Sequence, residues 1–171
     1  LVQDVLNTPP YVRISRMIRD ISATDILVGN KHTNLRQMVE QELAAEDVAR
    51  RVQEIRFREI NQQQVRAAEL TLQDFAYTTA VSDEHFLQWV TTDNKIAGFC
   101  RLSLPHWDKL TSGACDVTAN ELLVQPGQAM IRELHVYGQA LSLGSEGMSA
   151  QHQGLGQKLL AKASSIAAEA G

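Results

Sequence analysis

Cysteine, aromatic side chains and long apolar runs are all scarce in this sequence of 171 residues. Its two cysteines, Cys100 and Cys115, are too few for a disulfide framework or a thiolate cluster, so both are expected as small buried apolar residues. No apolar run is long enough to span a bilayer, and the amino terminus lacks the charged-then-apolar layout of a signal peptide. These absences favour a cytoplasmic protein. No clustered set of ligands stands out either, so no metal site is predicted.

The composition that remains is that of an ordinary globular protein. Hydrophobic residues make up 44% and charged residues 21%, which suits one core with a small appended segment. The formal net charge is −4, yet a basic segment lies near the amino terminus. Its cations are Arg13, Arg16, Arg19, Lys31 and Arg36. Such a segment can contact phosphates, although a solvated face paired with Asp20 and Asp25 explains it equally well.

Periodicity divides the chain into two parts, residues 1–58 and residues 59–171. In the first part, apolar residues recur at helical spacing between positions 35 and 56, which predicts one long helix with a break near 45–47. The preceding segment, residues 11–18, alternates with period two and therefore favours a strand, although its arginines also fit helical spacing.

The second part has strand periodicity. Alternating residues predict strands at 69–76, 86–92 and 96–104, and the turn-forming residues 93–95 join the last two as a hairpin. Residues 108–128 then form an insertion of irregular pattern.

The most informative stretch combines a strand, a glycine loop and a helix. Residues 131–138, IRELHVYG, form a strand that ends at a glycine, and QHQGLG at 151–156 opens an amphipathic helix. The first turn of a helix has unpaired backbone N–H groups and partial positive charge, so it attracts a diphosphate. Glycines at positions 154 and 156 lack the Cβ atoms that would keep such an anion away. The spacing differs from the dinucleotide fingerprint and from the Walker loop.

The strand at 131–138 also carries the candidate catalytic residues. Strand alternation predicts two faces, with Glu133, His135 and Tyr137 on one and Arg132, Leu134 and Val136 on the other. A carboxylate or imidazole near an amine or water can accept its proton, so Glu133 and His135 are the candidates for a general base. The alternatives are structural: Glu133 pairs with a neighbouring arginine, and His135 is a hydrogen-bonded core residue.

Together these motifs resemble one protein family, the catalytic subunit of Elongator, which modifies the wobble uridine of tRNA, in a prokaryotic form. The spacing Q-x-x-G-x-G is that of the coenzyme A loop in the GCN5-related N-acetyltransferase superfamily, and IRELHVYG narrows the resemblance to the Elongator family. Four segments of the amino-terminal half agree with it: YVRISRMIRDI, TDILVGNK, TNLRQ and IRFREI. The resemblance extends over most of the chain.

The resemblance implies an α/β (α+β) fold. This is the GCN5-related N-acetyltransferase fold, with a mixed, mostly antiparallel sheet preceded by a basic linker and a long helix. Residues 1–58 would be the end of a radical domain and a linker, and residues 59–171 an acetyltransferase-like domain whose last strand and helix are absent from this chain. The residues placed against acetyl-CoA are Glu133, Leu134, His135, Val136, Gln151, Gln153, Gly154, Leu155, Gly156 and Gln157. The residues placed against tRNA are Arg13, Arg16, Arg19, Lys31 and Arg36.

The resemblance also implies an activity, that of an acyltransferase of the tRNA carboxymethyluridine synthase type. In the family, tRNA triggers hydrolysis of acetyl-CoA, and a radical domain of the same polypeptide uses S-adenosylmethionine and a four-iron four-sulfur cluster to modify carbon five of uridine 34. Two cysteines cannot supply the three thiolates of that cluster, so its ligands lie outside this chain. The expected partners are tRNA, acetyl-CoA and that radical domain, without a membrane, and the sequence is compatible with an oligomer.

Two other functions remain open. A protein-lysine N-acetyltransferase would use acetyl-CoA at the same site, but the short connection at 77–85 leaves no room for the helices that usually grip the acceptor in that superfamily. A non-catalytic interaction domain would keep the fold without the chemistry. The intact Gln151, Gly154 and Gly156 argue against a loss of coenzyme binding.

Overall fold

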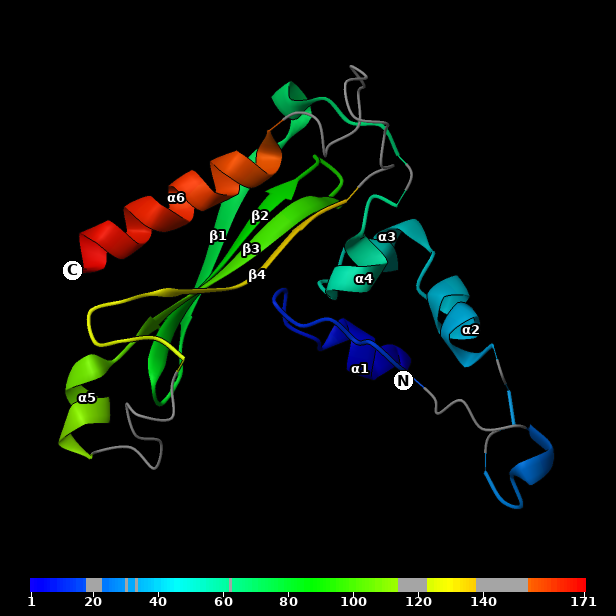
Figure 1. The fold of residues 1–171 in the computed structure, drawn as a ribbon. Coiled ribbons are helices and arrows are strands. Elements are labelled where there is room, and N and C mark those ends of the chain that lie inside the picture. Colours follow the sequence, from blue (N-terminus) through cyan, green and yellow to red (C-terminus); the bar gives the residue numbers. More distant parts are fainter. Residues whose placement is uncertain (18–22, 30, 33, 62, 114–122, 138–153) are drawn as a thin grey trace. The chain divides into compact units, whose positions relative to one another are not determined.

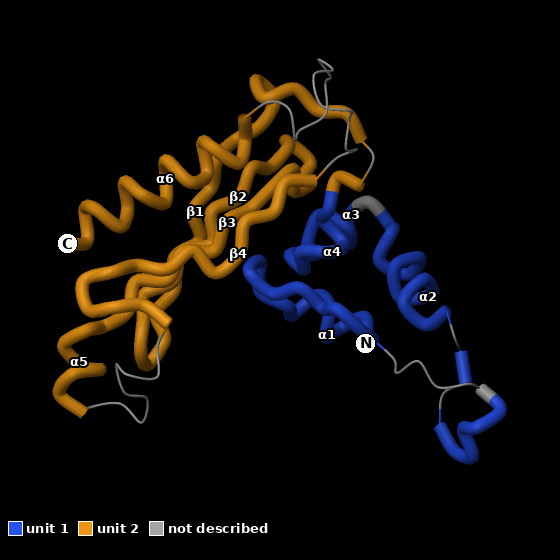
Figure 2. The backbone as a smooth tube through the Cα atoms, in the orientation of Figure 1, with its two compact units in different colours: residues 1–59 blue, residues 60–171 orange. Residues whose placement is uncertain are grey.

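The computed structural model describes residues 1–17, 23–29, 31–32, 34–61, 63–113, 123–137 and 154–171. The chain forms two compact units, residues 1–59 and residues 60–171 (Figure 2). In these described ranges, no helix combines the length and the apolar character needed to cross a membrane.

Short helices around a small apolar core make up the first unit. They are α1 (Val2–Leu6), a 3-10 turn (Ala23–Asp25), α2 (Leu35–Glu42), α3 (Glu46–Ala49) and α4 (Ile55–Arg58) (Figure 1). The break predicted near 45–47 lies close to the observed one between α2 and α3, but the chain breaks again after α3, so the prediction of one long helix was wrong. In a straight helix Val39 and Val52 would lie about 20 Å apart along the axis. The breaks bring both into one buried cluster with Val5 and Leu43.

The segment at residues 12–16 lies in neither a helix nor a strand, so the predicted strand was wrong as well. Its backbone is held by contacts with other parts of the unit instead of a neighbouring strand. The Ile55 amide donates to the Val12 carbonyl at 3.1 Å, and the Ile14 amide donates to Oε1 of Glu54 at 2.6 Å. Glu54 is buried, and its Oε2 also accepts the Phe57 amide at 2.8 Å, which caps the start of α4.

The second unit is built on a four-stranded sheet. Its elements are a 3-10 turn (Ala67–Glu69), β1 (Thr71–Thr78), β2 (Ser82–Val90), β3 (Ile96–Pro105), α5 (Trp107–Ser112), β4 (Met130–Val136) and α6 (Leu155–Ala170). Among the described strands the order is β1-β2-β3-β4, and every neighbouring pair is antiparallel. This mixed helix and sheet architecture confirms the predicted fold class.

Two details of this unit differ from the predictions. β2 begins at Ser82, four residues before the predicted start, because the Thr79 hydroxyl binds the backbone and side chain of Ser82 and closes a short turn. The helix α5 was not predicted, because its six residues are too few to show a helical period. It ends at Gly113, whose φ of 74° is readily adopted only by glycine.

One face of the sheet is covered by α6 (Figure 1). The helix turns Leu155, Leu159, Ala163 and Ile166 toward the sheet, at the spacing of a single apolar stripe. They pack in two clusters with β-strand residues that include Leu87, Ala97, Cys100 and Leu102. Cys100 is fully buried, which confirms its predicted role as a small core residue, whereas Cys115 lies outside the described residues.

Candidate functional site

The candidate site is built on β4, which has a single neighbour, β3, among the described strands. The two strands approach closely at Gly98, which is paired with Val136. A Cβ atom at Gly98 would lie 2.9 Å from the His135 carbonyl oxygen and 3.3 Å from the Val136 Cα. The absence of a side chain at position 98 therefore sets how near β3 the His135–Val136 backbone lies.

The two faces of β4 have different surroundings. On one face, Leu134 and Val136 point toward α6: a Cβ atom at Gly156 would lie 3.9 Å and 3.5 Å from their side chains. The pairing of Glu133 with Arg101 and of His135 with Phe99 places these two residues on the opposite face, with Tyr137 beside His135. The predicted alternation is therefore confirmed for positions 133 to 137.

Arg132 departs from that alternation. The register shifts at this point, since Arg101 pairs with Glu133 while Leu102 pairs with Ile131, so Arg132 is the extra residue of a β-bulge. The Arg132 guanidinium donates from Nη1 to Oε2 of Glu84 on β2 at 3.2 Å. Arg132 thus lies on the same face as Glu133, and its predicted place beside Leu134 and Val136 was wrong.

Glu133 is held by a neighbouring arginine. Nε of Arg101 donates to Oε2 of Glu133 at 2.9 Å, which is the structural alternative that the sequence left open. The same guanidinium lies over the rings of Phe86 and Phe99, with 5.2 Å and 5.5 Å to the ring centroids. Sequence reasoning missed Arg101, although its position in a predicted strand and its charge opposite to that of Glu133 were a usable signal.

His135 has quite different surroundings. The side chain is exposed, its ring stacks on Phe99 at 5.9 Å between centroids, and Tyr137 lies at 4.4 Å. Within the part of the chain that the structure describes, its ring nitrogens have no hydrogen-bond partner. The imidazole is therefore not the hydrogen-bonded core residue of the structural alternative. Of the two candidate bases, His135 is the one whose acceptor atom is not already bound to another described side chain.

The start of α6 has the features that an anion site requires. Gly154 precedes the helix with a φ of 67°, a backbone conformation that glycine adopts more readily than other residues. No acidic residue occupies the first turn of the helix, where negative charge would repel an anion. The indole Nε1 of Trp89 donates to the Leu155 carbonyl at 3.3 Å and ties this turn to β2. These residues fit a diphosphate, because within the described part of the chain the first-turn amides have no side-chain cap and the first turn holds no acidic residue.

The residues predicted to bind the coenzyme around the start of α6 differ in their exposure, and two of them lie outside the described residues. Leu155 is fully buried, so only its backbone can serve a ligand, and Gln157 is exposed. A Cβ atom at Gly156 would point toward β4 and make only ordinary van der Waals contacts with Leu134 and Val136, so the packing of α6 on the sheet does not itself require this glycine. Gln151 and Gln153 lie outside the described residues.

The candidates for tRNA contact belong to the first unit. Arg13 pairs with Glu59 at 3.0 Å, and Arg36 pairs with Glu40 at 3.1 Å and also donates to the Ile14 carbonyl. Arg16 and Lys31 are exposed, and Arg19 lies outside the described residues. Arg36 thus stabilises the basic segment through its hydrogen bond to the Ile14 carbonyl, while Arg16 and Lys31 are exposed.

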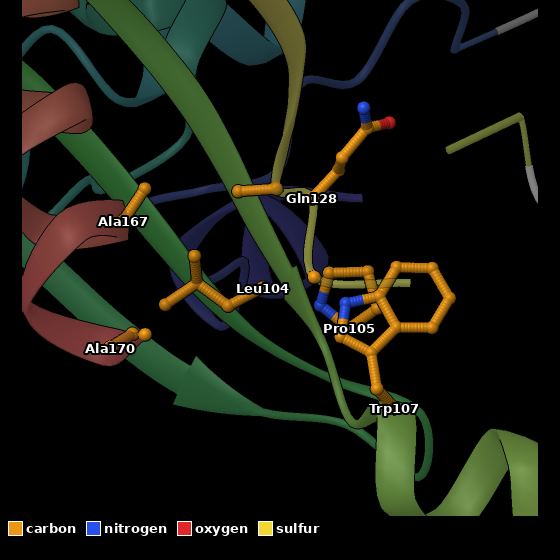
Figure 3. A pocket seen from close by; sticks show the side chains of 9 residues that line it. Leu104, Pro105, Trp107, Gln128, Ala167 and Ala170 are labelled. Atoms are coloured by element: carbon orange, nitrogen blue, oxygen red, sulfur yellow. The ribbon is translucent and has the colours of Figure 1, made fainter. Parts of the chain in front are cut away.

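A small open pocket lies at the other end of α6, away from Gly154 (Figure 3). It has a volume of about 80 Å³ and lies between Ala167 and Ala170 of α6 and Leu104, Pro105 and Trp107 of the neighbouring segment. Ala167 and Ala170 lie about 18 to 23 Å along the helix axis from Leu155 in the first turn, so the pocket takes no part in the site at β4.

Comparison with known proteins gives several relatives, although no protein-family model matches the chain. The chain is 39% identical over 163 residues to a tRNA uridine(34) acetyltransferase of Dehalococcoides mccartyi (strain CBDB1), an alignment that covers 93% of this chain and 33% of the relative. It is 29% identical over 167 residues to Elongator complex protein 3 of Homo sapiens, covering 94% and 28% of the two chains.

A solved structure agrees with these relatives. The archaeal Methanocaldococcus infernus Elp3 with an N-terminal deletion superposes with a TM-score of 0.73 and 26% identity, over 98% of this chain and 38% of the archaeal one. The chain spans about a third of the length of the curated relatives it matches. These similarities confirm the resemblance predicted from IRELHVYG and QHQGLG: the chain is homologous to tRNA uridine(34) acetyltransferase and to Elongator complex protein 3, the Elongator catalytic-subunit family.

Proposed function

We propose that this chain is the acetyl-CoA-binding part of an enzyme that modifies uridine 34 of tRNA. The observation that carries the proposal is the 39% identity with tRNA uridine(34) acetyltransferase, which extends over 93% of the chain. The geometry supports it, because β4, which is an edge strand among the described strands, and the first turn of α6, which has no side-chain cap among the described residues, lie side by side through Val136 and Gly156. A thioester and a diphosphate of one ligand would find complementary groups there.

The roles of the individual residues follow from their surroundings. The backbone of β4 from Glu133 to Val136 would pair with the pantetheine arm, and the first-turn amides of α6 would bind the diphosphate. When bound, acetyl-CoA supplies the acetyl group as a thioester. His135 would accept a proton from the attacking water, since its exposed imidazole has no competing hydrogen bond within the described residues. Glu133, already bound to Arg101, would orient the strand.

The finer assignment couples this site to tRNA. In this proposal tRNA binding at the basic segment switches on acetyl-CoA hydrolysis, and the acetyl group serves a radical S-adenosylmethionine step that leads to a carboxymethyl-type uridine. The ligands of the iron–sulfur cluster that this step requires would lie in another domain of the same polypeptide. Arg16 and Lys31, which are exposed, are the described cations best placed to contact phosphates.

The deciding experiment measures acetyl-CoA hydrolysis by the full-length enzyme, with and without tRNA, in parallel with a peptide amine as acceptor. We expect hydrolysis only with tRNA, and a loss of about 100-fold or more in His135→Gln, the usual contribution of a general base. His106→Gln is the matched control, because His106 pairs with Asp83 beside α5, outside the proposed site. Acetylation of the peptide without RNA would identify a lysine acetyltransferase instead, and full activity of His135→Gln would place the base elsewhere.

A further inference from the structure

A buried carboxylate outside the proposed coenzyme site joins three strands of the sheet. Glu84 of β2 has a side chain that is only 5% exposed. Its Oε1 accepts the hydroxyls of Ser82 at 2.7 Å and Ser103 at 2.6 Å, and its Oε2 accepts the Arg132 guanidinium at 3.2 Å. Ser103 belongs to β3 and Arg132 to β4, so one side chain connects β4 to a strand that is not its neighbour.

Burial of such a charge is unfavourable unless the charge is paired and hydrogen-bonded. A carboxylate taken from water loses several kcal/mol of hydration, and only good geometry with additional hydrogen bonds offsets this loss. Glu84 meets that requirement with two hydroxyls and a cation. Among the described residues, no buried side-chain nitrogen or oxygen lacks a hydrogen-bond partner. Only the carboxylate of this ion pair is buried, since the Arg132 side chain is 50% exposed, and such a pair contributes little net stability over an apolar pair, so a role in fixing one arrangement accounts better for its presence.

The arrangement that it fixes is the bulge of β4. With the bulge, Arg132 and Glu133 both lie opposite Arg101, and Ile131 pairs with Leu102. A regular ladder would instead pair Arg132 with Leu102 and would turn the guanidinium toward the apolar face under α6. The Glu84 carboxylate binds Arg132 only in the bulged register. β4 is an edge strand among those described, and pairing along one edge alone specifies its register weakly.

We propose that Glu84 and Arg132 form a register lock for β4, and that both are positioning residues for the strand that presents His135. The lock acts from the face opposite to α6 and leaves the backbone edge of β4 open. The expected effect of the lock on acetyl-CoA binding rests on the function proposed above, whereas its effect on the register of β4 does not. A second contact, from Arg101 to Glu133, lies directly beside it and holds the next residue of the strand.

Hydrogen exchange of the intact protein under native conditions tests the lock directly. Glu84→Gln keeps the acceptor for the hydroxyls but puts an NH₂ group against Arg132, and Arg132→Met removes the cation at similar length. We expect the amides of residues 133–136 to exchange about tenfold faster or more in both variants, while those of β2 and α6 keep their rates. Arg132→Lys, which retains the charge, should restore most of the protection.

The matched control is Gln88→Leu, which removes a buried polar contact on the same face, to Gln73 of β1. It should leave exchange at residues 133–136 unchanged. Equal acceleration in all strands of Glu84→Gln would show a general loss of stability and would overturn the register lock. Unchanged exchange in both Glu84→Gln and Arg132→Met would overturn it too.

Acetyl-CoA affinity, measured by calorimetry on the same variants, separates the two proposals. If both are right, Glu84→Gln and Arg132→Met bind acetyl-CoA about tenfold more weakly, equivalent to about 1.4 kcal/mol, and Gln88→Leu binds it normally. Wild-type protein that fails to bind acetyl-CoA would refute the proposed function, while the exchange rates would still decide the lock. Faster exchange at β4 with unchanged affinity would refute the positioning role.

Discussion

The close approach of β3 and β4 at Gly98 makes Gly98→Ala a test of whether the position of β4 matters for function. The new methyl group would lie 2.9 Å from the carbonyl oxygen of His135 and 3.3 Å from the Cα atom of Val136. Both are backbone atoms, so no side-chain rotation relieves the contact. Carbon and oxygen atoms in strand contacts are normally about 3.3 to 3.6 Å apart, so β4 has to move by about 0.5 Å.

The expected losses of stability and activity follow from this shift of β4. Adding a methyl group to a well-packed site typically lowers the free energy of unfolding by about 1 to 3 kcal/mol. For a chain of this size that loss lowers the melting temperature by about 2 to 12 °C. The shift falls on His135 and Val136, in the strand segment that we propose pairs with the pantetheine arm, and because a displacement of 1 Å can cost about 100-fold in rate, we expect a loss of about tenfold in the proposed tRNA-dependent acetyl-CoA hydrolysis.

The assay compares Gly98→Ala with Gly113→Ala by thermal denaturation and by hydrolysis rate. Gly113 ends α5 with a φ of 74° and has open space around it, so alanine there costs about 1 to 2 kcal/mol through backbone strain alone. Gly113→Ala should therefore melt earlier and retain its hydrolysis rate. If both variants lose stability and neither loses activity, the argument that Gly98 positions a functional strand is refuted.

Three further predictions address the helix, the thiol and the basic segment. Gly156→Ala makes only ordinary packing contacts and improves helix propensity, so thermal unfolding should show a gain of up to about 1 kcal/mol, and a loss would contradict the packing seen here. Burial raises the pKa of Cys100 to about 11, so in a Cys115→Ser background its labelling by a disulfide reagent at pH 8 should be slow and should accelerate about tenfold per pH unit below 11; labelling at the rate of a free thiol would contradict its burial. Arg16→Gln should weaken tRNA binding and flatten its salt dependence by about one unit, and Arg36→Gln, whose guanidinium contacts Glu40 and the Ile14 carbonyl, should lower the melting temperature; an unchanged affinity of Arg16→Gln would remove Arg16 from the interface.

The elements of the site could be predicted from sequence because their signals are local. β4 shows period two over positions 133 to 137, and α6 shows an apolar stripe that starts at a glycine. The bulge at Arg132 had no such signal, since it depends on how β4 pairs with β3 and on a carboxylate 48 positions earlier. Alternation can assign faces only where the register is uninterrupted.

The prediction of one helix in the first unit was wrong for a related reason. Apolar spacing over residues 35–56 fits one helix as well as it fits three short ones. Tertiary packing decided between them, because Val39 and Val52 reach the same cluster only if the chain turns. The arginines of residues 12–16 likewise fitted both a strand and a helix. The segment forms neither a strand nor a helix. The carboxylate of the buried Glu54 accepts a hydrogen bond from the Ile14 amide instead.

The two candidate bases, Glu133 and His135, were equivalent in sequence because they share a strand and a face. The residues opposite them on β3 make them different: Arg101 binds the carboxylate at 2.9 Å, while Phe99 offers the imidazole only a stacking surface. A carboxylate already bound to an arginine is less available to a ligand than an imidazole that has no hydrogen-bond partner among the described residues. The proposed assignment of the base to His135 therefore rests on the strand beside it, because the residues of β3 that pair with Glu133 and His135 distinguish two side chains that the sequence left equivalent.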